Sequence, residues 1–158
     1  MTFYNPDNST AQESVRRARE AARQLNIELI ERHVRSPEAL QQALLELKPR
    51  EADALSYVND AMVTSHSQMV IGIATSKRLP VVFPSPSSAK EGALLTYGVS
   101  YRESGRLSAK YVQRVLAGTR PRDLPVEALI KPSFVINLKV ARELGIAVPN
   151  VVLLQADA

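Results

Sequence analysis

Short apolar runs alternate with amphipathic stretches along almost the whole chain, and this alternation restricts the fold more than any other feature. The runs at 54–58 and 80–83 have the length of buried strands. Between the runs, apolar residues recur every three or four positions, which is the spacing of one helix face. Parallel strands need a helical crossover between them. The alternation therefore predicts an α/β fold, a three-layer sandwich with a mainly parallel sheet.

The predicted elements follow from this pattern. Strands are expected at residues 3–4, 27–34, 54–58, 80–83, 93–97 and 126–130. Helices are expected from Ser9 or Thr10 to Asn26, from Ser36 to 48–50, from Asn59-Asp60 to about Ile73, over 102–117, and from Asn137 to Gly145. In the 102–117 helix, the side chains predicted to face inward are Leu107, Tyr111, Val115 and Leu116.

Composition narrows the classes of function. The 158 residues suffice for one domain with a core, and the absence of Cys excludes disulfides, a thiol nucleophile and thiolate metal sites. The net charge of +4 is spread along the chain, without aromatic residues interleaved in a basic patch, so nucleic acid is not an expected partner. The chain shows no signal peptide and no apolar run of membrane-spanning length.

Motifs for catalysis are missing. The chain has no GxGxxG, no Walker loop and no GxSxG. His33 and His66, the two histidines, have no carboxylate or second histidine at ligand spacing, which favours structural or surface roles. We therefore expect no enzyme activity, no metal and no cofactor.

Polar residues gather where the predicted strands end. In an open parallel sheet, ligands bind beyond the carboxyl ends of the strands. The candidate ligand-binding residues at these positions are Asn5, Asn8, Ser9, Asn59, Asp60, Ser85, Tyr97 and Tyr101. Their amides, hydroxyls and carboxylate suit a small polar solute, and the helix starts beside them suit an anionic group.

Each candidate also has a purely structural interpretation. Asn8, Ser9 and Asn59 are good helix caps, and Asp60 suits a cap as well as a ligand ammonium group. Asn5 lies in a turn. Ser85 lies in a proline-rich loop where solvent exposure is expected. Tyr97 and Tyr101 can pack on an aromatic ligand, but Tyr101 can equally anchor the helix that follows it.

The stretch 91–149 carries a set of residues whose order and spacing are more specific than any member alone. They are Gly92-Ala93, Tyr97-Gly98, Tyr101, Gly105, Gly118, Pro121, Leu124-Pro125-Val126, Asn137-Leu138-Lys139, Ala141, Leu144-Gly145 and Pro149. In these features the chain resembles the C-terminal part of substrate-binding proteins of bacterial ABC importers, a family that includes proteins for tryptophan and tyrosine uptake.

The resemblance implies a type I periplasmic-binding-protein fold, of which this chain is one lobe. Residues 1–89 and 119–135 would form the core of the second lobe, 90–118 would cross to the first lobe, and 136–158 would form a C-terminal helix and tail. The first lobe and the export signal would be missing. The full-length form would be periplasmic or lipid-anchored outside the cytoplasm, bind a small solute such as an amino acid between its lobes, and deliver it to an inner-membrane ABC permease.

Two further expectations concern partners and alternatives. Without a first lobe, the apolar face of the 102–117 helix lacks a cover, which favours a homo-oligomer, with exchange of segments as one route. The alternative functions left open are an effector-binding regulatory domain, a flavodoxin-like cofactor domain, and a structural role for a dimerising lobe.

Overall fold

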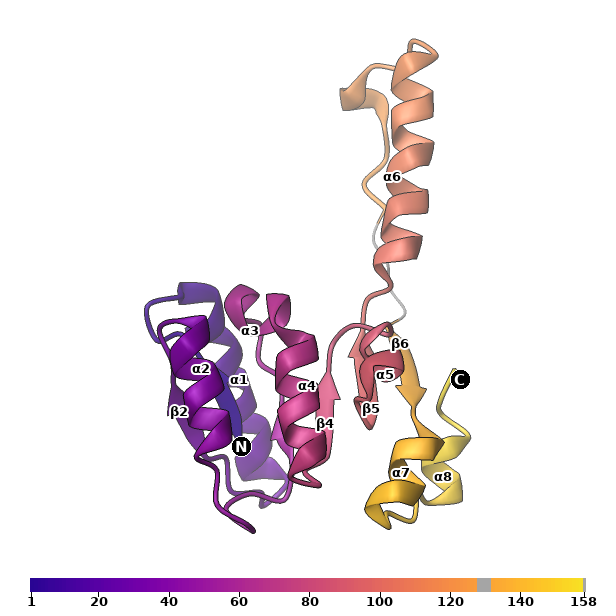
Figure 1. The fold of residues 1–158 in the computed structure, drawn as a ribbon. Helices are drawn as coiled ribbons and strands as arrows, with labels where there is room; N and C mark the ends of the chain where they lie inside the picture. Colours follow the sequence, from indigo (N-terminus) through magenta and orange to yellow (C-terminus); the bar gives the residue numbers. More distant parts are fainter. Residues whose placement is uncertain (128–131, 158) are drawn as a thin grey trace.

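A twisted, mainly parallel sheet organises the molecule (Figure 1). The computed structural model describes residues 1–127 and 132–157. Its strands are β1 (Thr2–Tyr4), β2 (Glu31–His33), β3 (Leu55–Ser56), β4 (Val81–Phe83), β5 (Leu95–Gly98) and β6 (Ser133–Ile136). β1 pairs with β2, and β3 to β6 pair in sequence order. Two backbone hydrogen bonds of 2.8 Å, from the Met1 ammonium to Ala54 and from the Ser56 N–H to Met1, join the two groups of strands.

Helices cover both faces of the sheet, which confirms the three-layer prediction. They are α1 (Ser9–Gln24), α2 (Pro37–Leu45), α3 (Ala61–Ser65), α4 (Ser67–Ser76), α5 (Ser88–Glu91), α6 (Tyr101–Leu116), α7 (Leu138–Leu144) and α8 (Asn150–Leu153), with a 3-10 turn at Pro121–Asp123. Side chains alternate between the faces of a strand. On β1, Phe3 packs into the core formed with α2 and α4, whereas Tyr4 packs against Val15 of α1.

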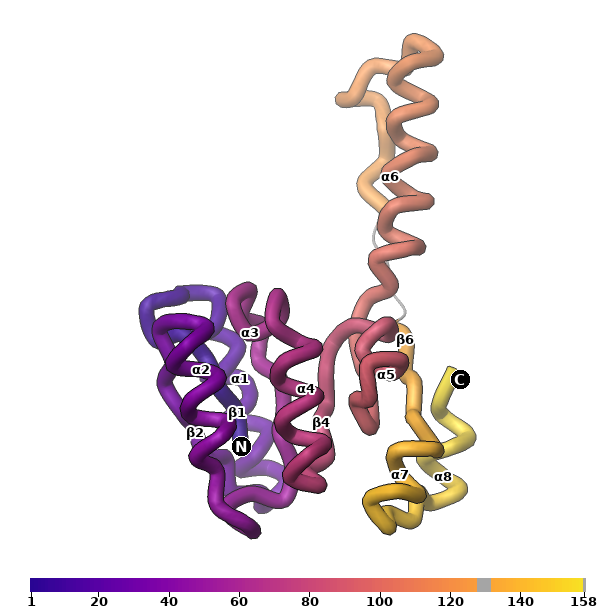
Figure 2. The backbone as a smooth tube through the Cα atoms, in the orientation of Figure 1, coloured from indigo at the N-terminus to yellow at the C-terminus, as the bar shows by residue number. Residues whose placement is uncertain are grey.

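The last strand departs from the expected topology. β4 and β5 are parallel, but β5 and β6 are antiparallel, with Leu95 opposite Ile136 and Gly98 opposite Ser133. Between β5 and β6 the described chain holds the projecting helix α6 and the 3-10 turn at Pro121–Asp123, and the two strands are direct antiparallel neighbours in the sheet (Figure 2). The strand predicted at 126–130 was wrong in part, because Val126 and Glu127 are irregular, while 128–130 lie outside the described residues.

Helix α6 projects away from the rest of the molecule as an arm (Figures 1 and 2). The prediction that its apolar side chains point into a core was wrong: none of the 16 residues of α6 is buried. Leu107 and Tyr111 are half-buried, and the Tyr111 hydroxyl donates to the Pro125 carbonyl of the returning segment. Val115 is 40% exposed and Leu116 83%. Amphipathicity produced the helix, but the described chain supplies no sheet for its apolar side.

Three smaller differences concern single elements. Strand β2 is limited to Glu31–His33, although 27–34 was expected. The single helix expected after Asp60 is divided into α3 and α4 at His66, whose ring Nδ1 lies 2.8 Å from the Met62 carbonyl. Helix α8 was not predicted, because its four residues are too few to show a period.

Candidate functional site

The carboxyl ends of five strands face the same edge of the sheet. The strands β1 to β5 run in one direction, so the loops that follow Tyr4, His33, Ser56, Phe83 and Gly98 open on this side. We call this side the carboxyl edge. It holds all of the predicted binding residues, although their contacts with a ligand stay a prediction.

The loop after β1 leads into α1 through a network of local caps. The Asn5 side-chain carbonyl accepts from the Asp7 N–H at 2.9 Å. Asn8 is the N-cap of α1, and its side chain accepts from the N–H groups of Thr10 at 3.0 Å and Ala11 at 3.3 Å. The exposed Ser9 is the first residue of this 16-residue helix. The positive end of a long helix dipole therefore opens onto the carboxyl edge.

Asp60 occupies a structural position beneath this edge. Its side chain is fully buried. One carboxylate oxygen accepts from the Asn5 N–H at 2.8 Å, and the other from the N–H groups of Met62 at 2.9 Å and Val63 at 3.2 Å. The carboxylate thus caps α3 and ties the loop after β1 to the loop after β3. Three backbone donors satisfy much of its accepting capacity inside the protein.

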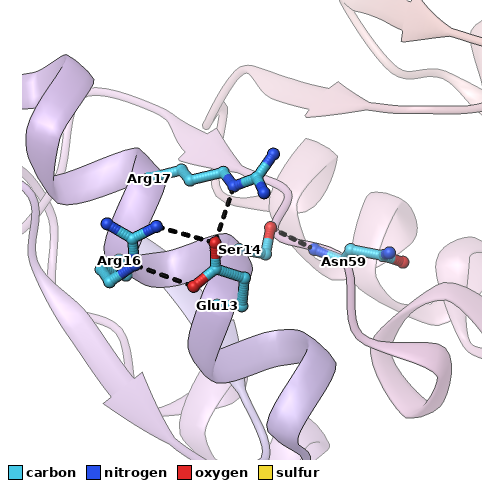
Figure 3. A network of polar contacts seen from close by, with 5 residues as sticks. All are labelled: Glu13, Ser14, Arg16, Arg17 and Asn59. Atoms are coloured by element: carbon cyan, nitrogen blue, oxygen red, sulfur yellow. Dashed lines mark hydrogen bonds and ion pairs between the residues drawn. The ribbon is translucent and has the colours of Figure 1, made fainter.

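Asn59 connects the carboxyl edge to α1 (Figure 3). Its backbone N–H donates to the Ser14 hydroxyl at 2.9 Å. An open groove of about 480 Å³ lies here. Its lining residues are Ser9, Thr10, Glu13, Ser14, Arg17 and Asn59. Hydroxyl, amide, carboxylate and guanidinium groups therefore share one small surface, which we call the Asn59 groove.

Charges in the Asn59 groove are paired. Arg16 and Arg17 each donate to Glu13, at 2.8 Å and 2.9 Å (Figure 3). These hydrogen bonds lower the pKa of Glu13 to about 2, so it is an anion at neutral pH. Because the three side chains are largely exposed, they present a solvated ion-pair network whose arginines can re-pair with an anionic ligand.

Aromatic rings lie beside this polar surface. The Tyr57 hydroxyl donates to the Asn59 side chain at 2.9 Å and accepts from Thr64 at 3.1 Å. Burial raises the pKa of Tyr57, whose ring packs against Phe83 of β4 with ring centroids 5.6 Å apart. Tyr101 is 70% exposed. The sequence analysis missed Tyr57, although its place directly after a strand, two positions before Asn59, was a usable signal.

The remaining candidates lie toward β6. Tyr97 is 60% exposed and packs edge-on against Phe134 of β6, with ring centroids 6.1 Å apart. Ser85 and Ser87 share a hydroxyl–hydroxyl hydrogen bond of 2.8 Å in the loop after β4. Asn5, Asn8, Ser9, Asn59 and Asp60 are thus joined by contacts around α1 and α3, whereas Ser85 and Tyr97 belong to the β4–β6 part of the edge.

A second, more apolar groove of about 840 Å³ lies at the opposite edge, where the strands begin. Leu25, Ile27 and Ala54 contribute to its lining. The sequence analysis did not anticipate it, because its walls come from loops far apart in the chain. Among residues 1–127 and 132–157, no three metal-ligating His, Asp or Glu side chains form a cluster. No described helix has both the length and the apolarity needed to cross a bilayer.

Comparison with known proteins confirms the resemblance. The family model described as ABC transporter substrate binding protein matches residues 1–158. A tyrosine-binding protein of Clostridioides difficile (strain R20291) is 24% identical over 135 residues, which are 85% of this chain and 39% of that protein.

Two solved structures share the fold. A conserved domain protein from Vibrio cholerae has a TM-score of 0.82 and 28% identity, over 99% of this chain and 52% of that one. An ABC domain in complex with L-Trp from Streptococcus pneumonia has a TM-score of 0.82 and 23% identity, over 99% of this chain and 54% of that one. The chain thus spans about half the length of these structures. With its whole length matched by the family model, the chain belongs to the family of ABC transporter substrate-binding proteins.

Proposed function

We propose that this chain is a solute-binding lobe of an ABC importer and that its carboxyl edge is the ligand surface. The observation that carries the proposal is the junction at Asn59. There α1, the capped loop of Asn5 and the ring of Tyr57 are joined by hydrogen bonds through Asn59 and Asp60. An open parallel sheet binds ligands at this edge.

An amino acid fits the chemistry of this surface. Its carboxylate would lie at the start of α1 near Ser9, where free helix N–H groups and the dipole favour an anion. The Asn59 side-chain amide would orient its polar atoms, and the exposed Tyr101 ring would cover an apolar or aromatic side chain. The relatives named for tyrosine and in complex with L-Trp support an aromatic amino acid as the solute. Asp60, which already accepts from three backbone N–H groups, would act by holding the two loops in place.

The complete site would lie between two lobes. The chain spans 52% and 54% of the two similar structures, so the opposing surface would come from a second lobe. Residues 1–89 and 119–135 would form the present lobe, 90–118 would cross to the other, and 136–158 would close the lobe as C-terminal helix and tail. This assignment agrees with the arm, since α6 leaves the sheet after β5 without covering it (Figure 1). The whole protein would act outside the cytoplasm, in the periplasm or on a lipid anchor, and deliver solute to a membrane permease.

Calorimetry tests the proposal. One lobe buries about half of a ligand and cannot close over it. We therefore expect L-tyrosine or L-tryptophan to bind the 158-residue chain weakly, with Kd well above 1 µM, which corresponds to about −8 kcal/mol. Asn59→Ala should weaken this binding further, whereas the exposed variant Gln41→Ala on α2 should leave it unchanged. A submicromolar Kd, or equal binding by Asn59→Ala, would contradict the proposal.

A further inference from the structure

Asparagine and aspartate side chains supply most of the polar groups in the loops after β1 and β3. They are Asn5, Asp7, Asn8, Asn59 and Asp60. An asparagine amide accepts hydrogen bonds through its oxygen and donates through its NH₂ group, whereas a carboxylate only accepts. The groups that are already engaged inside the protein therefore determine what these two loops can offer to a solute.

All three asparagines use their amide oxygen inside the protein. The oxygen of Asn5 accepts from the Asp7 N–H at 2.9 Å, and that of Asn8 accepts from two N–H groups in the first turn of α1. The oxygen of Asn59 accepts from the Tyr57 hydroxyl at 2.9 Å. Within residues 1–127 and 132–157, none of the three NH₂ groups donates to another residue. Each amide therefore keeps its two N–H donors available.

The Tyr57 hydroxyl holds the exposed amide of Asn59 in this orientation. The Thr64 hydroxyl donates to the Tyr57 oxygen at 3.1 Å, which leaves the single phenol hydrogen for the Asn59 oxygen. The phenol itself is held in place, because its ring packs against Phe83 with centroids 5.6 Å apart. A turn of the Asn59 amide would place its NH₂ group against the Tyr57 hydroxyl and break this order of donors. Tyr57 therefore sets which atoms Asn59 presents.

The carboxylates around Asn59 are engaged as well. Asp60 is fully buried and accepts from three backbone N–H groups. In the loop after β1, Asp7 accepts from the Arg35 guanidinium at 2.9 Å. In the Asn59 groove, Glu13 pairs with two arginines. An ammonium group would have to displace one of these partners, whereas a carboxylate would meet free N–H donors.

Given the proposed function, on which this step rests, we infer that the lobe binds the carboxylate of its solute and leaves the α-amino group to the opposing lobe. Asn59, the exposed one of the three asparagines, donates to a carboxylate oxygen. Tyr57 acts through Asn59 as a positioning residue. The solute class for this lobe is therefore an aromatic carboxylate, with or without an α-amino group.

Three indole compounds separate the two ends of the solute. L-Tryptophan carries both charged groups, indole-3-propionate lacks the amino group, and tryptamine lacks the carboxylate. Their Kd values for the ¹⁵N-labelled 158-residue chain are measured from the amide shifts of the carboxyl edge. We expect the Kd of indole-3-propionate to lie within about threefold of that of L-tryptophan, and the Kd of tryptamine to be at least about tenfold higher.

The variant Asn59→Asp tests which atoms face the solute. Its carboxylate can still accept from Tyr57, but the NH₂ donor is replaced by an anionic acceptor. The ratio of the tryptamine Kd to the indole-3-propionate Kd should therefore fall by at least about tenfold. The matched variant Asn150→Asp, at an exposed residue of α8, adds the same charge elsewhere and should leave the ratio unchanged.

The variant Tyr57→Phe tests the positioning role. Without the hydroxyl, the Asn59 amide is free to turn and to present its oxygen, so the same ratio should fall by at least about threefold. A purely structural loss would raise both Kd values and leave the ratio unchanged, which would contradict the role of Tyr57. Tyr111→Phe, which removes a hydroxyl from α6, is the matched control.

The outcomes separate this assignment from the proposed function. If tryptamine binds the carboxyl edge as tightly as indole-3-propionate does, or if Asn59→Asp leaves the ratio unchanged, the carboxylate assignment is overturned while the proposed function stands. If none of the three compounds shifts the amides of the carboxyl edge, the proposed function fails, and the carboxylate assignment fails with it.

Discussion

The buried carboxylate of Asp60 accepts a hydrogen bond of 2.8 Å from the backbone N–H of Asn5, 55 positions earlier in the sequence. The same carboxylate caps α3. One side chain therefore fixes the relative position of the loops after β1 and β3, between which the Asn59 groove opens. The candidate site depends on this connection even if Asp60 never touches a ligand.

The variant Asp60→Asn should keep the cap of α3 but lose the hydrogen bond that joins the loops after β1 and β3. An asparagine oxygen can still cap α3, but its NH₂ group cannot accept from Asn5, whose partly buried N–H then loses its partner. We expect the free energy of unfolding in urea to fall by about 1–3 kcal/mol. The exposed Asp53→Asn serves as the control. An Asp60→Asn protein within about 0.5 kcal/mol of wild type would show that the contact contributes little.

Gly98→Ala should disturb the end of β5. A Cβ on Gly98 would lie 2.1 Å from the Pro84 carbonyl oxygen, so the backbone would have to move. We expect a loss of about 2 kcal/mol or more in thermal or urea unfolding. Gly72→Ala is the matched change, because its Cβ enters open space on α4, and it should stabilise the protein by up to about 1 kcal/mol. Equal stabilities for the two variants would contradict the close packing of β5 on the loop after β4.

Lys77→Met should loosen the end of α2. The Lys77 ammonium donates to the carbonyls of Leu45 at 2.7 Å and Leu47 at 2.9 Å, which no longer have partners inside the helix. Because Lys77 is exposed, we expect a modest loss of about 1 kcal/mol in unfolding free energy. Lys90→Met, at an exposed position of α5, tests the loss of a lysine charge alone. If Lys77→Met and Lys90→Met lower the unfolding free energy equally, the loss comes from the change in net charge and not from the hydrogen bonds of Lys77.

Acidification should weaken the link between α1 and the sheet. Two hydrogen bonds from Arg19, at 2.6 Å and 2.8 Å, lower the pKa of Glu31, and the bond of 2.9 Å from the Tyr4 hydroxyl adds to this. Because the folded-state pKa is below the unfolded value of about 4.3, the stabilisation is full above that pH and is lost as pH falls through the folded-state value.

Glu31→Gln removes this titration. Its melting temperature should therefore fall less than that of wild type between pH 6 and pH 3. Plotted against pH, the melting temperatures of the two proteins should converge at low pH. Glu28→Gln, at an exposed position outside this network, should follow wild type. Parallel curves for Glu31→Gln and wild type would contradict the role of Glu31.

Much of the fold could be predicted because its signals are local. Ser36 and Asn137 cap α2 and α7 as expected, and Gly145 ends α7 with a positive φ of 73°. The topology after β5 could not be predicted, because residues 126–130 and 133–136 both have the composition of strands. Ser133–Ile136 forms the strand because it pairs with β5, and this pairing is not visible in the sequence. The period of α6 likewise predicts an apolar side but cannot show whether the chain provides a cover for it.

The positions of the candidate residues in the fold were predictable, but their contacts were not, and their role in binding stays a prediction. Strand order alone placed Asn5, Asn59 and Tyr101 on the carboxyl edge. The sequence did not show that Asp60 holds the loop of Asn5 while Asn59 contacts α1. These roles depend on hydrogen bonds with Asn5 and Ser14, which lie 55 and 45 positions away. Long-range hydrogen bonds of this kind leave no periodic trace in the sequence.

The most direct test of the central claim is a map of where a solute binds. We expect titration of the ¹⁵N-labelled chain with L-tyrosine or L-tryptophan, to about 10 mM because weak binding is expected, to shift the amide resonances of Ser9, Asn59 and Tyr101. The amides of Leu25, Ile27 and Ala54, in the groove at the opposite edge, should stay in place. Shifts confined to that opposite groove, or no shifts anywhere, would contradict the assignment of the carboxyl edge as the ligand surface.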